Sequence, residues 1–216
     1  LRVHRYFFRV FALDVETLRA SPSREYTPLA WDAVAGSLEL EFVVHDHGVA
    51  GRWAADAPIG SIVGIGGPRG SMVMEGAPAG WFLAGDETAL PAIRRLLAGL
   101  ARSAPEGQGV VLLEVPDADH QIAIDVPEGT ALRWIHRGDA APGSALSRAL
   151  DALGSADRPG AGAGAGSGAV FAFVAAEHAV VKSGRALVLD RWQLDADGVI
   201  VKGYWRRGEA EYHAPH

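Results

Sequence analysis

The run Trp81-Phe82-Leu83-Ala84-Gly85-Asp86-Glu87-Thr88-Ala89-Leu90-Pro91-Ala92-Ile93 decides the fold that we predict for this chain. Its first four residues are apolar and predict a short buried strand, whereas Asp86 and Thr88 are residue types that begin helices. Apolar positions with helical spacing follow at Leu90, Ile93, Leu96, Leu97 and Leu100. A buried strand that leads directly into a helix is typical of a parallel sheet covered by helices.

The same alternation of strand and helix continues to the end of the 216 residues. Apolar runs at residues 110–115, 132–136, 170–175 and 199–204 predict further strands, and residues 144–153 and 177–190 predict helices. A Gly-Ala run at 160–168 precedes a strand, whereas a phosphate-binding glycine loop follows one, so we interpret it as a flexible surface loop. Residues 79–216 are therefore predicted to form an α/β domain whose parallel sheet is covered on both faces.

Residues 1–78 have β character instead. Residues 2–15 are rich in Phe and Val and contain no Gly or Pro, and residues 61–65 are a second short candidate strand. Residues 38–45 alternate between apolar and acidic positions, which is typical of a half-buried antiparallel strand. Gly- and Pro-rich turns separate these runs. We therefore predict an α+β two-lobed fold, in which a small antiparallel β-barrel precedes the parallel-sheet α/β domain.

The composition excludes several classes of function. The absence of cysteine rules out disulfides, thiolate metal sites and a cysteine nucleophile. The formal net charge is −6 with scattered Lys and Arg, so we expect no nucleic-acid binding. No apolar run is long enough to span a bilayer and no leader is evident, so we expect no membrane span and a cytoplasmic location. His45 and His47 lack a third ligand, so we expect no metal site, and the oligomeric state is left open.

Four short stretches carry the functional signal. They are residues 24–28 (Arg-Glu-Tyr-Thr-Pro), 45–54 (His-Asp-His-Gly-Val-Ala-Gly-Arg-Trp-Ala), 85–93 and 202–208 (Lys-Gly-Tyr-Trp-Arg-Arg-Gly). In this order and at similar separations they resemble signatures of the siderophore-interacting protein family. That family consists of flavin-containing reductases of ferric siderophores, with an FAD-binding barrel and an NAD(P)H-binding α/β lobe. The resemblance implies a ferredoxin-NADP reductase-like fold, FAD bound between the lobes, and NADPH or NADH as the reductant.

The resemblance implies FAD contacts in the first two stretches. An Arg guanidinium can hold a phosphate through two hydrogen bonds, and a Tyr two residues further along a strand projects to the same side, where it can lie against the flavin ring. In the family the second stretch wraps the FAD diphosphate with backbone N–H groups and a small hydroxyl residue, whose expected place Gly51 takes here. The cofactor-binding residues assigned on this basis are Arg24, Tyr26, Thr27, His45, Ala50, Gly51 and Trp53.

Further assignments fall in the second half of the chain, each beside a purely structural interpretation. Asp86, Thr88 and Ala89 are placed at the flavin edge, although the same residues could simply cap a helix. Arg137 is assigned to the ribose phosphate of NADPH, although it could equally be a solvated strand end. The last strand could be an apolar strand that is simply followed by basic residues, or a binding surface, and we prefer the binding surface. There Tyr204 and Trp205 are assigned to the cofactors, and Lys202, Arg206 and Arg207 to an anionic ferric chelate. Glu177, at the end of the preceding strand, is assigned to cofactor binding.

Two departures from the family pattern leave a second hypothesis open. Ala176 and His178 stand where the family has Gly and Ala, which predicts a weakened nicotinamide site. Residues 19–23 also replace a loop and a strand of the barrel. Our leading prediction is an NAD(P)H-driven, FAD-dependent reductase that releases Fe(II) from a ferric siderophore. The alternative, which these departures and Gly51 favour, is a non-redox relative that uses the cleft between the lobes to bind or cyclise an apolar biosynthetic intermediate.

Overall fold

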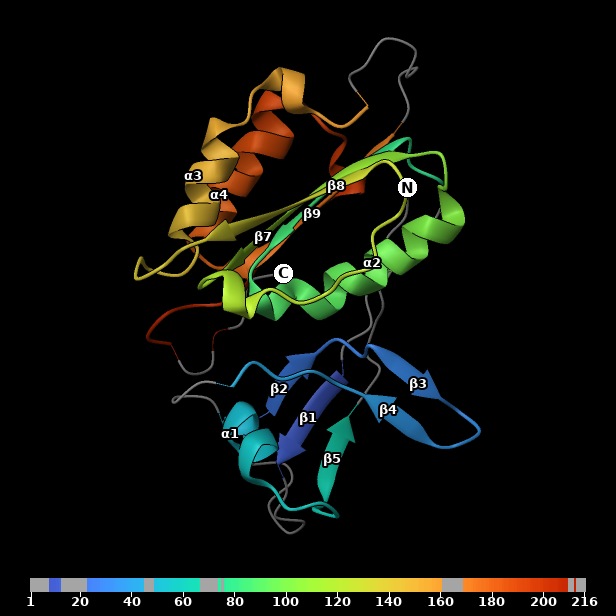
Figure 1. The fold of residues 1–216 in the computed structure, drawn as a ribbon, viewed down its shortest axis with the longest axis vertical. Coiled ribbons are helices and arrows are strands. Elements are labelled where there is room, and N and C mark those ends of the chain that lie inside the picture. The colour runs from blue at the N-terminus through green and yellow to red at the C-terminus, as the bar shows by residue number, and fades with distance from the viewer. Residues whose placement is uncertain are drawn as a thin grey trace. The chain divides into compact units, whose positions relative to one another are not determined.

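The computed structural model describes residues 8–12, 23–44, 49–66, 74, 76–160, 169–209 and 212. The chain divides into two compact units, residues 3–73 and residues 74–216, which we term the N-terminal and C-terminal units. The expected domain limits, 1–78 and 79–216, remain predictions. Each unit has its own sheet system, and Figure 1 shows the elements of both.

The N-terminal unit is built on small antiparallel sheets. Strand β1 (Phe8–Ala12) pairs with β2 (Ser23–Tyr26) on one side and with β5 (Val63–Gly66) on the other. Strands β3 (Ala30–Asp32) and β4 (Ser37–Glu39) form a separate hairpin, and helix α1 spans Val49–Asp56. The predicted antiparallel sheet is therefore confirmed, whereas its closure into a barrel stays a prediction. The shortened segment at 19–23 lies almost wholly outside the described residues.

Two predictions for this unit need correction. The strand expected at 38–45 ends at Glu39, and residues 40–44 are extended without ladder pairing, although Leu40 and Phe42 remain half-buried. The segment expected to be an anion-binding loop contains helix α1, because its apolar residues recur at helical spacing: Ala50, Trp53, Ala54 and Ala57. His45, at the start of that segment, lies outside the described residues.

The C-terminal unit is a three-layer α/β structure. Its five strands are all parallel in the order β10-β9-β6-β7-β8: β10 (Val199–Trp205), β9 (Val170–Glu177), β6 (Gly80–Gly85), β7 (Gln108–Val115) and β8 (Thr130–His136). Helix α2 (Leu90–Ser103) covers one face, and α3 (Ser144–Ala152) and α4 (Val180–Arg185) cover the other (Figure 1). The predicted parallel sheet with helices on both faces is confirmed.

Short helical turns complete the unit. They are η2 (Glu87–Ala89), η3 (Ala118–His120), η4 (Ser155–Asp157), the π-helical turn η5 (Ala186–Arg191) that continues α4, and η6 (Ala196–Gly198). The helix expected at 177–190 therefore begins three residues later and ends as a π turn. The Gly-Ala run lies outside the described residues from 161 to 168.

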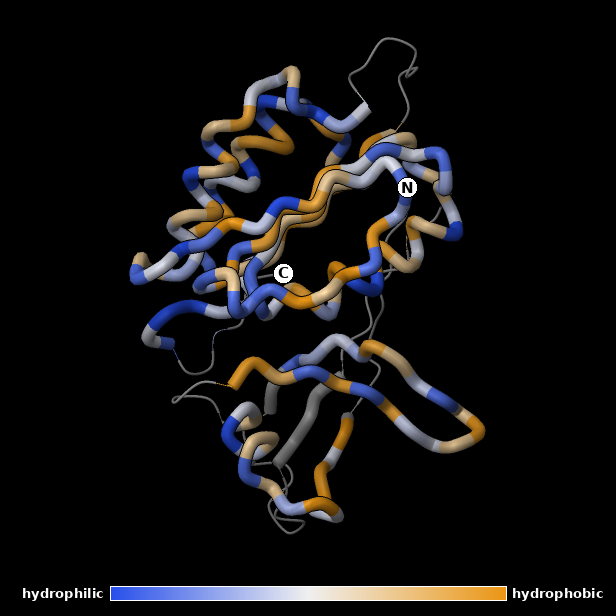
Figure 2. Tube along the Cα trace, viewed as in Figure 1, coloured by the Kyte–Doolittle hydropathy of each residue, from blue (hydrophilic) through white to orange (hydrophobic). Residues whose placement is uncertain are grey.

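The buried core of the C-terminal unit explains why its central strands could be predicted from the sequence. Every residue of β6 and β9 is buried, so both appear as continuous apolar runs, and Figure 2 shows this apolar character on the central strands. Strand β8 is an edge strand, and its residues alternate between half-buried and exposed over most of its length. Under α3 and α4 the core includes Phe82, Leu112, Leu146, Leu150, Val174 and Trp192.

Candidate functional site

The strand order of the C-terminal unit places a candidate binding position. From β6 the chain builds β7 and β8 on one side, then crosses to β9 and β10 on the other. The sheet order therefore reverses between β6 and β9. In open α/β sheets, ligands bind outside the carboxyl ends of the strands at such a reversal. The residues that matter are those at the ends of β6, β9 and β10.

Asp86 connects these three strand ends. Its Oδ1 accepts hydrogen bonds from the Thr88 backbone N–H (3.0 Å) and hydroxyl (2.5 Å). Its Oδ2 accepts from the Glu177 backbone N–H and from Trp205 Nε1, both at 2.8 Å. The Asp86 side chain is fully buried, and this burial raises its pKa, while the bonds from Thr88 and Trp205 act in the opposite direction. The expected helix cap is present, but the same carboxylate also joins β9 and β10 to β6.

Gly85 allows the turn η2 to fold back onto the end of β6. A Cβ at Gly85 would lie 2.5 Å from the Ala89 Cβ and 2.7 Å from the Ala175 carbonyl oxygen. Both distances are far shorter than a van der Waals contact. The glycine of this motif is therefore required by close packing of β6, β9 and η2. Ala89 itself is fully buried beneath Gly85, so it is a packing residue of the junction.

Glu177 and His178 organise the end of β9. The Glu177 carboxylate accepts hydrogen bonds from the Ala179 N–H (2.5 Å) and from the Arg207 N–H (3.1 Å), and its residue is only 6% exposed. The His178 N–H donates to the Trp205 carbonyl oxygen, and its Nδ1 lies 2.7 Å from the Tyr212 hydroxyl. Both side chains therefore hold the segment that follows β10 against the end of β9.

Ala176 does not obstruct the candidate site in the way that its replacement of glycine suggested. Its methyl group belongs to the hydrophobic core, where the residue is 1% exposed. The extra carbon therefore packs inside the unit. Gly203, opposite Ala176 in the register of β10, is the position where added bulk would meet Tyr212 and His178.

Arg137 already has two carboxylate partners at the end of β8. Its Nη1 and Nη2 donate to the two oxygens of Glu87 at 3.0 and 2.6 Å, and Nη1 lies 3.8 Å from Glu114. Its side chain is 14% exposed. Burial alone lowers the pKa of Arg137, but Glu87 and Glu114 outweigh it and the net direction is upward. A ribose phosphate at this guanidinium would therefore compete with Glu87 for its charge.

Glu114 is a buried residue that sequence reasoning missed. Its carboxylate accepts hydrogen bonds from the Gly143 and Leu146 backbone N–H groups at 2.6 and 2.7 Å, which places its charge at the start of α3. The sequence did contain a signal, since Glu114 is the single charged residue within the buried strand β7. The ion pair of Glu87 with Arg137 was likewise not predicted, because Glu87 was interpreted only as part of the start of a helix.

Basic and aromatic residues occupy the end of β10. Lys202 and Tyr204 are half-buried, and the Tyr204 ring packs edge-on against Phe173 with centroids 6.4 Å apart. Arg206 and Arg207 are exposed, and Arg206 Nη1 lies 3.7 Å from the Glu209 carboxylate. The structure thus brings Asp86, Glu177, Trp205 and Arg207 together through hydrogen bonds, while Lys202 and Tyr204 lie on the same strand.

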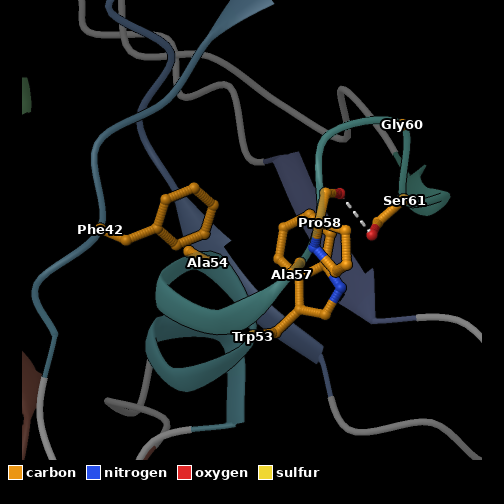
Figure 3. A pocket seen from close by; sticks show the side chains of 7 residues that line it. All are labelled: Phe42, Trp53, Ala54, Ala57, Pro58, Gly60 and Ser61. Carbon is orange, nitrogen blue, oxygen red and sulfur yellow. Dashed lines mark hydrogen bonds between the residues drawn. The ribbon is translucent and has the colours of Figure 1, made fainter.

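The N-terminal unit contains an aromatic cluster beside a hollow. The Tyr26 and Phe42 rings have centroids 4.5 Å apart, and the Phe42 and Trp53 centroids are 6.4 Å apart. A hollow of about 330 Å³ is lined by residues that include Phe42, Trp53, Pro58 and Ser61. Figure 3 shows these side chains and the hydrogen bond from the Ser61 hydroxyl to the Pro58 carbonyl oxygen. Two assigned cofactor residues, Tyr26 and Trp53, are therefore linked through Phe42.

Gly51 has a structural reason that the sequence did not reveal. A Cβ at this position would lie 2.7 Å from the Val43 carbonyl oxygen, because the first turn of α1 packs directly on that extended backbone. A hydroxyl residue would not fit here without movement of residues 43–44. Arg24 lies on β2 opposite Val10, and Thr27, directly after β2, is half-buried.

Comparison with known proteins decides the family. The family model described as "Siderophore-interacting protein" matches residues 78–208, and that described as "Siderophore-interacting FAD-binding domain" matches residues 11–72. The chain belongs to the siderophore-interacting protein family. It is 32% identical over 195 residues to the ferric vibriobactin reductase ViuB of Vibrio cholerae, covering 88% of this chain and 67% of ViuB.

Other matches agree with this family. The chain is 35% identical over 127 residues to the NADPH-dependent ferric-chelate reductase of Escherichia coli, covering 59% of this chain and 50% of that protein. A siderophore utilization protein from T. fusca superposes with a TM-score of 0.79 at 32% identity, covering 96% and 81% of the two chains. The ferredoxin-NADP⁺ reductase of Plasmodium falciparum superposes with a TM-score of 0.56 at 11% identity over 93% and 83%, which shows the fold alone.

The described residues of this siderophore-interacting family member fit an FAD molecule. The first turn of α1 contains no acidic residue, so its backbone N–H groups remain suited to a diphosphate. Tyr26 and Thr27 are half-buried, which leaves part of each side chain accessible to a ring. Within the described ranges, no helix is long and apolar enough to cross a membrane, and no group of three His, Cys, Asp or Glu side chains could hold a metal ion.

Proposed function

We propose that this chain is an FAD-dependent reductase that uses NAD(P)H to reduce the iron of a bound ferric siderophore to Fe(II). The relatives named as ferric vibriobactin reductase and ferric-chelate reductase support the reaction type. The structural observation that carries the proposal is the rigid carboxyl edge of the C-terminal sheet. There Asp86 joins three strand ends and leaves Trp205 half-buried beside the point where the sheet order reverses.

The residues proposed to hold FAD come from several elements. Arg24 and the first turn of α1, with Ala50 and Gly51, would bind the phosphates, because guanidinium and helix N–H groups both favour anions. Tyr26 and Thr27 would contact the flavin ring, with His45 and Trp53 as further predicted contacts. In the C-terminal unit, Thr88, Tyr204 and Trp205 are the predicted flavin-edge residues, whereas the buried Ala89 is no longer among them. Bound FAD would supply the redox chemistry, since a flavin accepts a hydride and releases electrons singly.

The ferric chelate is the proposed substrate, and the end of β10 is its proposed binding surface. The reaction balances when one NAD(P)H reduces two Fe(III) to two Fe(II) and releases NAD(P)⁺ and one proton. Lys202, Arg206 and Arg207 would attract an anionic chelate. The backbone of Arg207 is already held by Glu177. The exposed Arg206 makes a long ion pair with Glu209, so opening that pair to reorient the Arg206 side chain costs little.

The choice between NADPH and NADH rests on Arg137. Its assignment to the ribose phosphate stays a proposal, and there a phosphate would share or compete for the guanidinium that Glu87 holds. NADH carries no such phosphate and makes no demand on this ion pair. Both reductants therefore belong to the proposal, and the experiment must compare them.

The non-redox alternative loses structural support at two positions. Gly51 is explained by packing on Val43, and the Ala176 methyl lies in the core. Neither residue therefore points to a lost cofactor. His178 remains a departure from the family, but its ring is engaged with Tyr212 at the surface of the C-terminal unit.

FAD titration followed by anaerobic reduction tests the proposal. The purified chain should take up FAD with a change in flavin absorbance, and the flavin should bleach on addition of NADPH or NADH. Added ferric siderophore should restore the absorbance and yield two Fe(II) per NAD(P)H in a colorimetric assay. Tyr26→Ala should weaken FAD binding, whereas Val34→Ala, at an exposed hairpin residue, should not. A chain that binds no FAD would refute the proposed function.

A further inference from the structure

Trp205 sits at an irregularity in the sheet. Strand β10 follows the register of β9 up to Gly203, and the register then shifts so that Trp205 lies opposite Glu177. A β-bulge of this kind redirects the side chains that follow it. The ladder therefore does not fix the direction of the Trp205 indole, and some other contact must do so.

Asp86 supplies that contact from another strand. Its Oδ2 accepts the Trp205 Nε1–H at 2.8 Å, and the same oxygen accepts the Glu177 N–H at 2.8 Å. The indole is thereby tied to the end of β6 across 119 residues of sequence, while the His178 N–H holds the Trp205 carbonyl oxygen. Two independent hydrogen bonds, one to the side chain and one to the backbone, hold this tryptophan.

Every acceptor position of the Asp86 carboxylate is occupied. Each carboxylate oxygen accepts two hydrogens, so both lone pairs of each oxygen are used. The carboxylate therefore has no acceptor position left for a ligand, and when it is ionised its hydrogen bonds are shorter and stronger than those of a neutral group.

We infer that Asp86 is a positioning residue that holds the Trp205 indole in one orientation at the carboxyl edge of the sheet and does not itself touch the cofactor. The residue is fully buried and every lone pair of its carboxylate is used, so a ligand has no access to it. This revises its assignment as a cofactor contact. The inference rests on the proposed function only for the role of Trp205 beside FAD.

The first test uses the FAD-free protein. The indole N–H signal of Trp205, identified by its loss in Trp205→Phe, is followed by NMR in the wild type and in Asp86→Asn. An amide has one acceptor oxygen and presents N–H groups to the remaining donors, so the indole bond is lost or weakened. Solvent exchange of the Trp205 indole should accelerate by about 10- to 100-fold, the equivalent of one charge-assisted hydrogen bond.

Trp192 provides the matched internal control. Its Nε1–H donates to the Gly154 carbonyl oxygen at 2.8 Å and not to Asp86, so its exchange should stay unchanged in Asp86→Asn. An unchanged Trp205 signal would overturn the inference. Equal acceleration of both indoles would also overturn it, because Asp86 would then stabilise the unit as a whole.

A second test uses FAD binding and the induced circular dichroism of the flavin. If Asp86 acts through Trp205, Trp205→Phe should weaken FAD binding by about 10-fold, and the Asp86→Asn/Trp205→Phe double variant should show no further loss. Additive losses would indicate a direct contact of Asp86 with FAD and refute the inference. An unchanged FAD affinity of Trp205→Phe would contradict the role of Trp205 beside FAD. If Asp86→Asn fails to fold, the wild-type indole exchange decides the role of Asp86, since a Trp205 indole that exchanges as fast as an exposed tryptophan would overturn the inference. A wild type that binds no FAD refutes the proposed function, whereas the indole exchange still decides the role of Asp86.

Discussion

Replacing Gly85 by alanine should destabilise the C-terminal unit by about 2 kcal/mol. The added Cβ would lie 2.5 Å from the Ala89 Cβ, 2.7 Å from the Ala175 carbonyl oxygen and 3.1 Å from the Ile93 Cδ1. The first two atoms belong to rigid groups that cannot rotate away, so β6, β9 or η2 must move. Overpacking of this kind costs about 1–3 kcal/mol, and we expect the upper end because two contacts must be relieved at once.

A smaller effect in the unfolded chain acts in the opposite direction. Alanine restricts the unfolded state more than glycine does, which returns about 0.4–1 kcal/mol. The net loss of about 2 kcal/mol corresponds to a melting temperature lower by about 4–8 °C for a unit of this size. Urea and thermal unfolding, each followed by circular dichroism, would measure it.

Gly99→Ala is the matched control in the same unit. Gly99 lies inside α2, and nothing lies within 4 Å of the position that its Cβ would take. Alanine is favoured over glycine in a helix interior by about 0.5–1 kcal/mol, so this variant should be more stable than the wild type. The same chemical change is thus predicted to act in opposite directions at two sites. Equal stability of Gly85→Ala and wild type, or destabilisation by both variants, would refute the packing argument.

Three further predictions concern other contacts of the two units. Gly51→Ser should lower the free energy of unfolding of the N-terminal unit by about 1–3 kcal/mol, seen as a lower unfolding midpoint. An unchanged midpoint would show that residues 43–44 can move to make room for the side chain. Glu114→Gln should cost about 1–3 kcal/mol in urea unfolding because one buried N–H at the start of α3 loses its acceptor, whereas exposed Glu106→Gln should have little effect. Burial chiefly raises the pKa of Tyr212, so the folded state keeps a proton that unfolded tyrosine loses near pH 10. Stability should therefore fall as the pH rises from about 10 through the higher folded pKa, and Tyr212→Phe should remove that part of the fall; an identical pH dependence in the variant would contradict it.

The parallel sheet was predictable because its central strands are buried on both faces. Such strands must be apolar throughout, and short apolar runs of this kind stand out between glycines and charged residues. Boundaries were less accurate at α4, where the residues after Glu177 first form a turn held by the Glu177 carboxylate. That hydrogen bond is a tertiary feature, and periodicity does not report it.

The N-terminal unit was harder to predict because its elements are short and half-buried. Alternation correctly separated the half-buried residues from the exposed ones up to Phe42, whereas Val44, expected on the half-buried face, is exposed. A strand also needs a partner, and residues 40–44 have none in the described ladders. The segment around Gly51 was interpreted as a diphosphate-binding loop from its resemblance to the family motif. Gly51 is needed there because α1 packs on the Val43 backbone, a requirement that only the tertiary structure imposes.

Tertiary contacts also explain why the sequence located the motif residues of the candidate site but did not predict what each side chain contacts. Asp86, Glu177 and Trp205 belong to recognisable motifs, but hydrogen bonds across 91 and 119 residues of sequence decide that Asp86 faces inward toward the other two. Arg137 makes the point most sharply. An arginine at a strand end has the same sequence pattern whether it binds a phosphate or forms an ion pair with Glu87, 50 residues earlier. Only the position of the partner carboxylate distinguishes the two roles, and a comparison of NADPH with NADH as reductants would show whether Arg137 also binds a phosphate.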